Sequence, residues 1–118
     1  MNTNERLIKI SETIQELGVS PVNEGYTFLR EAIGFVMENP SLIHNITKEL
    51  YPMIAKRYNT TKNAVERLIR FSIDKSYNRA HQELWESMFK YSQRAYDGKA
   101  TNGEFIATVA DYLLLREN

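Results

Sequence analysis

Apolar residues recur every three or four positions along most of the chain, the spacing at which side chains share one face of an α-helix. The first such stripe covers residues 4–17 and ends at Gly18, a residue type that tolerates the left-handed conformation common after a helix. A second stripe covers residues 26–37 and stops at Asn39-Pro40, because proline lacks an amide hydrogen and disfavours helix in the residue before it. The pattern predicts two amphipathic helices here.

The centre of the chain, about residues 48–79, has the pattern of two helices joined by a tight turn. Ala55 is small enough for two helices to approach closely, and Asn59, four positions later, tolerates a left-handed turn. Val65 and Leu68 are expected to face the first helix of the pair. The second helix has three potential capping residues: Thr60, Thr61 and Asn63. This spacing matches the helix-turn-helix, whose second helix enters the DNA major groove.

Helical spacing continues to the C-terminus. Residues 81–96 place four large apolar side chains on one side, namely Leu84, Trp85, Met88 and Phe89. Thr101 and Glu104 have the spacing of a capping box, and a further apolar stripe follows them. The sequence therefore predicts an all-α fold of about six helices, forming a single domain over residues 1–118.

Charge is unevenly distributed along the chain. The 118 residues contain fifteen basic and fifteen acidic side chains, so the formal net charge is zero. Residues 56–79 nevertheless have seven basic side chains against only Glu66 and Asp74, an excess of five positive charges (7 − 2 = 5). Such a concentration is typical of a surface that binds phosphate groups, although solvated helix faces often look similar.

Helical geometry places Glu66, Arg67 and Arg70 on one face of the second helix, within about 100° of one another. The opposite face is expected to be core: Val65, Leu68, Ile69, Ser72 and Ser76. An arginine fork can bond O6 and N7 of guanine, and a glutamate can accept from the exocyclic amine of cytosine. Alternatively, Glu66 and Arg70 form only a solvent-exposed ion pair four residues apart.

Polar and basic residues surround this face and are candidates for contact with the DNA phosphates. They are Lys56, Thr60, Thr61, Lys62, Asn63, Lys75 and Arg79. Such contacts would give affinity and salt dependence without sequence preference.

Other chemistry has little support in the sequence. The absence of cysteine excludes disulfides and thiolate chemistry, and His44 and His81 are too far apart in sequence for a local metal motif. There is no glycine-rich phosphate loop or nucleophile elbow, so neither an enzyme nor a metal or other cofactor is expected. No apolar run approaches the roughly 18 residues of a membrane span, and the polar start does not resemble a signal peptide. A soluble, cytoplasmic protein with no membrane contact is expected.

Six segments in order resemble a known family. They are residues 14–19 (IQELGV), 25–33 (GYTFLREAI), 46–56 (ITKELYPMIAK), 59–61 (NTT), 65–70 (VERLIR) and 101–111 (TNGEFIATVAD). With these segments the chain resembles the C-terminal DNA-binding effector domain of the stage-zero sporulation master response regulator of endospore-forming Firmicutes.

The resemblance implies six helices with an embedded helix-turn-helix that binds a TGTCGAA-type promoter box. The box often occurs as tandem copies, on which a dimer of the domain could bind. In that family the glutamate and the two arginines of the VER-x-IR motif read the box, and they correspond to Glu66, Arg67 and Arg70. The region of Met88, Phe89 and Tyr91 corresponds to a surface associated with contact to the RNA polymerase sigma factor, provided that these side chains are exposed.

The chain also departs from the family pattern around its base-reading trio. Leu68, Phe71 and Tyr77 stand where the family typically has Ala, His and Trp, and Ala64 replaces a residue that is often basic. A second function class therefore stays open, a helical interaction module with weakened DNA binding whose partner is a sigma factor or a full-length relative. The 118 residues include no phosphorylatable receiver domain, which would need about a hundred more.

Overall fold

The computed structural model describes residues 2–90 and 100–117 of the chain. This part contains six α-helices and no strand: α1 (Thr3–Glu16), α2 (Gly25–Glu38), α3 (Tyr51–Arg57), α4 (Lys62–Ser76), α5 (Gln82–Phe89) and α6 (Asn102–Leu114). Three short helical turns complete it: η1 (Pro40–His44), η2 (Ile46–Leu50) and η3 (Tyr77–Arg79). The predicted all-α fold of about six helices is confirmed.

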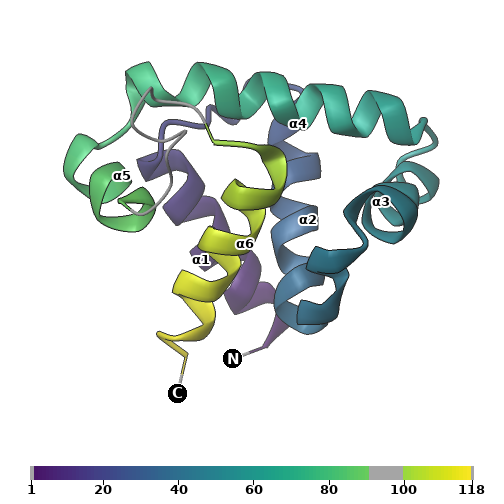
Figure 1. The fold of residues 1–118 in the computed structure, drawn as a ribbon, viewed down its shortest axis with the longest axis horizontal. Coiled ribbons are helices and arrows are strands. Elements are labelled where there is room, and N and C mark those ends of the chain that lie inside the picture. The colour runs from purple at the N-terminus through teal and green to yellow at the C-terminus, as the bar shows by residue number, and fades with distance from the viewer. Residues whose placement is uncertain (1, 91–99, 118) are drawn as a thin grey trace.

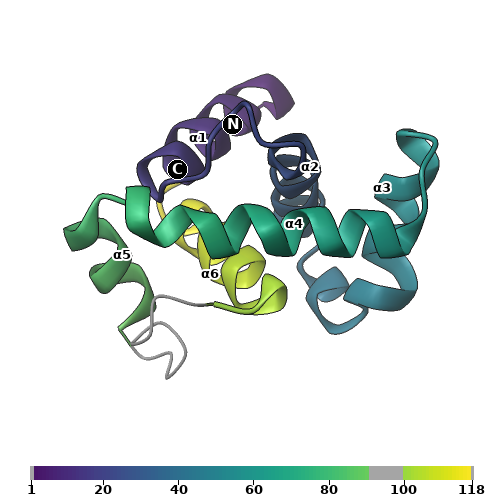
Figure 2. The same cartoon turned by 90° about the horizontal axis from the view of Figure 1, so that it is seen from above.

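Helix α4 crosses one side of the molecule, and the other helices lie against or beside it. In Figure 1 it runs along the top, with α3 at one end and α5 at the other, while α1, α2 and α6 lie below it. Figure 2, seen from above, shows α4 passing in front of α2 and α6. No described helix therefore covers the outer face of α4.

Several helix ends follow the local sequence signals. Gly18 has a φ of 94°, as expected for a left-handed residue after α1, and α2 ends directly before Asn39-Pro40. At the start of α6 the Thr101 hydroxyl accepts from the Glu104 amide (3.0 Å), and the Glu104 carboxylate accepts from the Thr101 amide (3.4 Å). The predicted capping box is thus confirmed.

The hydrophobic core is built around α2, which packs against α1, α3, α4 and α6. Its Leu29, Ala32 and Ile33 side chains are completely buried. All the other described helices contribute buried apolar residues to the same cluster, so the tertiary contacts of α2 hold α4 in place from beneath.

Two glycines allow other segments to approach the backbone of α4 closely. A Cβ added to Gly25, the first residue of α2, would lie 2.1 Å from the carbonyl oxygen of Leu68. A Cβ added to Gly18 would lie 2.0 Å from the carbonyl oxygen of Ser76. Only glycine fits at these two points, which place the start of α2 and the end of α1 directly against α4.

An aromatic cluster joins α5 to α6 and corrects one expectation from the sequence. The Trp85 and Phe89 ring centroids are 4.6 Å apart, and the Phe89 and Phe105 rings stack at 5.6 Å. Phe89 is only 3% exposed, so it is a core residue, and the exposure that the expected sigma-factor contact requires is absent at this position. The helix predicted over residues 81–96 is seen as α5, and its last residues lie outside the described part of the chain.

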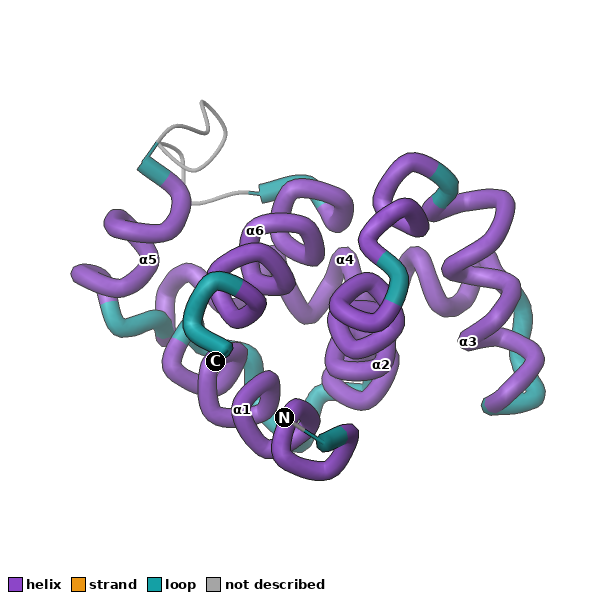
Figure 3. The backbone as a smooth tube through the Cα atoms, turned by 90° about the horizontal axis from the view of Figure 1, so that it is seen from below, coloured by secondary structure: helices purple, strands orange, loops and turns teal. Residues whose placement is uncertain are grey.

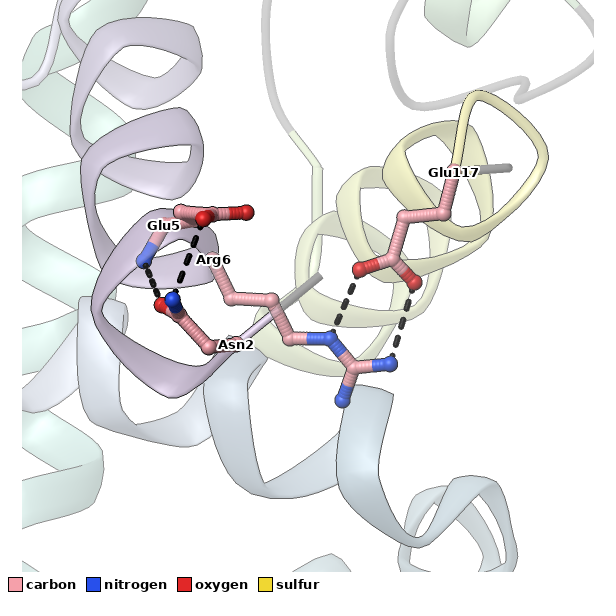
Figure 4. Close-up of polar contacts among 4 residues, drawn as sticks. All are labelled: Asn2, Glu5, Arg6 and Glu117. Atoms are coloured by element: carbon pink, nitrogen blue, oxygen red, sulfur yellow. Dashed lines mark hydrogen bonds and ion pairs between the residues drawn. The ribbon is translucent and has the colours of Figure 1, made fainter.

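The two ends of the described chain lie close together, as the view from below in Figure 3 shows. Arg6 in α1 makes a bidentate contact with Glu117, with Nε to Oε1 at 2.7 Å and Nη2 to Oε2 at 3.0 Å. Figure 4 shows this contact beside the cap of α1, where Asn2 accepts from the Glu5 amide. The contact lowers the pKa of the Glu117 carboxyl and raises the pKa of Arg6.

Among the described residues, no helix is both long enough and apolar enough to cross a bilayer.

Candidate nucleic-acid interface

The helix pair α3–α4 has the turn that the sequence predicts. Asn59 has a φ of 54°, the only positive value at a non-glycine residue in the described chain, and the Thr60 amide donates to the Ala55 carbonyl at 2.9 Å. Of the three potential caps, Thr61 begins α4, with its hydroxyl oxygen accepting from the Ala64 amide at 3.1 Å. Ala55 is 6% exposed and lies in α3, which packs against α4. The helix-turn-helix arrangement is therefore present.

The buried face of α4 is centred on three fully buried side chains, those of Val65, Ile69 and Ile73. Ser72 and Ser76 are buried too, as the helical geometry predicts. Leu68 is only partly buried, so its expected place in the core is wrong. The physical reason is that Ile73 extends the buried stripe in the other direction, which leaves Leu68 at its margin.

The free face of α4 holds the three predicted base-reading side chains. Arg67 and Arg70 are exposed, and Glu66 is partly exposed. Arg70 and Glu66 form an ion pair along the helix. In the protein without DNA, these two residues therefore make the surface ion pair that the sequence analysis gave as the alternative to base reading. Phe71 is 47% exposed, and the Arg70 guanidinium lies 5.8 Å from its ring centre. A partly exposed ion pair of this kind contributes only a few tenths of a kcal/mol to stability, so it can open when a stronger partner is available.

The predicted phosphate-contacting residues surround this face and are all exposed. They are Lys56 in α3, Thr60 and Thr61 in the turn, Lys62, Asn63 and Lys75 in α4, and Arg79 in η3. Thr61 uses its oxygen as the cap of α4, and its hydroxyl proton is still able to donate.

Part of the positive charge between residues 56 and 79 is neutralised locally. Arg57 lies 3.6 Å from the Glu31 carboxylate, which also accepts from the Tyr58 hydroxyl at 2.7 Å, and Arg70 pairs with Glu66. Burial and the bond to Glu31 raise the pKa of Tyr58, which stays protonated at neutral pH. The five other basic side chains form no ion pair with any described residue: Lys56, Lys62, Arg67, Lys75 and Arg79. These five cations supply the positive potential of the α3–α4 surface.

A groove of about 730 Å³ lies beside the free face, between η2, α4 and the start of α6. Glu66 and Arg70 form one side of it, and Tyr51 and Asn102 line it as well. The Asn102 side chain donates to the Tyr51 hydroxyl and to the backbone carbonyl of Glu66, both at 3.0 Å. Burial raises the pKa of Tyr51, with the bond from Asn102 acting in the opposite direction, so this hydroxyl is protonated at neutral pH.

Sequence reasoning did not identify Asn102 as part of this surface. Its partners are 36 and 51 residues away along the chain, so no local pattern marks the contact. The only available signal is its position directly after Thr101 in the segment that resembles the family.

The other candidate residues fall into two groups. Met88 is partly buried against the core, and Tyr91 lies outside the described residues, so the sigma-factor contact stays a prediction for these two. His44 and His81 are exposed. In the described ranges, no group of three or more His, Asp or Glu side chains is placed to hold a metal ion.

A helix-turn-helix whose second helix exposes arginines, within an all-helical fold, is the architecture of a major-groove DNA-binding domain. Comparison with protein families agrees: the family model described as the C-terminal of sporulation initiation factor Spo0A matches residues 10–113. The chain belongs to this family, which confirms the resemblance seen in the sequence. It is therefore a DNA-binding domain of a sporulation regulator.

Proposed function

We propose that this domain recognises a TGTCGAA-type promoter box by inserting α4 into the major groove, with Glu66, Arg67 and Arg70 reading base edges. The observation that carries this proposal is the free face of α4, where Arg67 is exposed without an ion-pair partner among the described residues and Arg70 has only a surface partner. At 15 residues α4 is about 22 Å long, enough to follow several base pairs along the groove.

The Glu66–Arg70 ion pair fits this role. In the free protein the pair keeps both side chains on the outer face of α4. On DNA, a guanine offers the Arg70 fork two acceptors, and Glu66 can then accept from a cytosine amine. The exchange costs little because a partly exposed ion pair is weak in water.

The proposal is tested by measuring the affinity of the domain for a duplex that contains the box and for a scrambled duplex of equal composition. Arg67→Ala and Arg70→Ala are each expected to cost about 1–3 kcal/mol on the box and to reduce its preference over the scrambled duplex. Lys9→Ala removes an exposed basic residue of α1 and serves as the matched control, with both affinities unchanged. If both arginine variants keep the parental preference, the proposed base readout is wrong.

The surrounding basic residues are proposed to contact phosphates. Lys62→Gln or Lys75→Gln is expected to weaken binding to both duplexes alike, and to reduce the slope of log affinity against log salt by about one unit per lost contact. The preference for the box is expected to stay the same. An unchanged slope in both variants would show that these lysines are only solvated.

The second function class, an interaction module for a sigma factor or a full-length relative, is favoured by one observation. The Phe71 ring is 47% exposed beside Arg70, where an apolar side chain suits a protein partner better than a phosphate. Equal, weak affinity for both duplexes would favour this alternative.

Two further predictions can be tested directly. The number of copies bound to a duplex with tandem boxes tests the predicted dimer. The affinity of the Met88→Ala variant for the sigma factor tests the predicted sigma-factor contact.

A further inference from the structure

Asn102, the first residue of α6, connects three helices through one side chain. Its Nδ2 atom donates to the Glu66 carbonyl in α4 and to the Tyr51 hydroxyl in α3, at 3.0 Å in each case. Both acceptors belong to the helix-turn-helix, and Asn102 lines the groove described above together with Tyr51 and Glu66. The contact therefore sets the distance between α6 and the helix pair at one defined point.

The orientation of the Asn102 amide is determined by its partners. A backbone carbonyl can only accept a hydrogen bond, so the nitrogen must face Glu66. The Oδ1 atom is buried and accepts no hydrogen bond from the part of the chain that the structure describes. The reverse orientation would place Oδ1 against the Glu66 carbonyl, where two acceptors repel each other. The amide thus makes its hydrogen bond to the Glu66 carbonyl, while Oδ1 has no partner among the described residues.

The bonded carbonyl lies at a sensitive place in α4. In an α-helix the carbonyl of residue 66 also accepts from the amide of residue 70. Asn102 therefore anchors the peptide unit of Glu66, within the same helical turn as Arg67 and Arg70. Hydrogen bonds to base edges depend steeply on distance and angle, so a small displacement of this turn weakens readout.

We infer that Asn102 is a positioning residue for DNA recognition. Its bridge to the Glu66 carbonyl and the Tyr51 hydroxyl holds the turn of α4 that contains Glu66, Arg67 and Arg70 in the position needed to contact base edges in the DNA major groove. The inference rests on the proposed function, because it concerns the readout made by Glu66, Arg67 and Arg70. Asn102 itself needs no contact with a base.

Two substitutions of Asn102 remove the donor in different ways. Asn102→Asp keeps the size of the side chain and suits the first turn of a helix, but it places a carboxylate oxygen against the Glu66 carbonyl. Asn102→Ala removes the bridge without adding charge. Val109→Ala is the matched control, because it creates a cavity at a fully buried position of the same helix and leaves the bridge intact.

The measured quantity is the ratio of affinities for the box and the scrambled duplex, at a temperature where every variant is folded. Both Asn102 variants are expected to lower this ratio by about fivefold or more, the discrimination that one weakened bidentate base contact accounts for. Val109→Ala is expected to lower the melting temperature while the ratio stays at the parental value. In the free protein, the Arg70 amide is expected to exchange faster with solvent in both Asn102 variants than in Val109→Ala.

The outcomes separate the two proposals. A parental protein that prefers the box, together with Asn102 variants that retain its ratio, overturns the positioning role and leaves the proposed function intact. An equal fall of the ratio in Val109→Ala also overturns it, because the effect would then come from lost stability alone. A parental protein that does not prefer the box overturns both proposals.

Discussion

The two parts of α4 are held in different ways. Residues 68–76 are fixed by backbone approaches, with Gly25 against the Leu68 carbonyl and Gly18 against the Ser76 carbonyl. Residues 62–67 are held by side chains and a cap: the fully buried Val65 side chain, the Thr61 cap at the helix start and the bond from Asn102 in α6. The two glycine contacts leave no free space, whereas the first part of α4 depends on one buried apolar side chain and on single hydrogen bonds.

The difference matches the division between fold and function. The buried face of the second part connects α4 to the core through α2 and the end of α1, so a change on that face is expected to unfold the whole domain. The first part presents Glu66 and Arg67 to the surface, and Arg70 follows at the start of the second part. Small adjustments in the first part are expected to alter readout before they alter stability.

The largest effect is expected from breaking the backbone contact at Gly25. Gly25→Ala would place a Cβ 2.1 Å from the Leu68 carbonyl oxygen and 2.2 Å from Ser72 Oγ, so α2 and α4 must separate. We expect the free energy of unfolding, measured by urea denaturation, to fall by about 3 kcal/mol or more.

The control for this change lies in the same helix. A Cβ at Gly34 would meet nothing closer than 3.8 Å, so Gly34→Ala is expected to stabilise the domain by about 0.5–1 kcal/mol through helix propensity. Equal stability of the two variants would contradict the close approach of α2 to α4.

A smaller loss is expected at the crossing of α3 with α4. Ala55→Leu would overpack a site that is 6% exposed and cost about 1–3 kcal/mol of unfolding free energy, with DNA affinity falling as α4 is displaced. Met53→Leu, at a 39% exposed position of the same helix, is the control and is expected to change neither property. Parental melting temperature and DNA affinity in Ala55→Leu would show that the assigned helix pairing is wrong.

Removing the cap of α4 is expected to cost about 1 kcal/mol. Thr61→Ala deletes the oxygen that accepts from the Ala64 amide, so the first turn frays while the contacts of residues 68–76 persist. Thr60→Ala, one position earlier and exposed, is expected to change stability by less than about 0.5 kcal/mol. Thermal melting of the two variants compares them directly, and the assignment of the cap fails if Thr60→Ala is the more destabilised.

The smallest effect is expected far from α4, at the contact between Arg6 and Glu117. The lowered pKa of Glu117 means that the pair stabilises the folded state above the ordinary pKa of 4.5, and that this contribution is lost as the pH falls through the folded-state value. Glu117→Gln is therefore expected to melt slightly below the parent at neutral pH, and the difference is expected to shrink as the pH falls below 4.5. Discrimination between DNA duplexes should not change. A difference in melting temperature that persists in acid would contradict this account.

Features that depend on a few neighbouring residues were predictable from the sequence. The left-handed residues Gly18 and Asn59, the end of α2 before Asn39-Pro40 and the capping box of α6 all match the expectations. Each involves groups within a few positions of one another, so local sterics and hydrogen bonding decide the outcome.

The candidate site was predictable only in part. Helical geometry placed Arg67 and Arg70 on the free face of α4, and both are exposed. It placed Leu68 in the core and left open whether Phe89 is exposed. The burial of Leu68 and of Phe89 depends on which surfaces α2, α5 and α6 cover. That depends on contacts between residues far apart in the sequence, so a local pattern cannot predict it.

What the sequence by itself determined is the set of helices, several of their ends and the charged face of α4, because helical periodicity and capping are short-range. Only the tertiary structure decided how α4 is held. Gly25 meets Leu68 across 43 residues (68 − 25 = 43), and Asn102 reaches Glu66 across 36. Contacts at such separations form only when the whole core packs, since the position of each helix depends on all the helices that surround it.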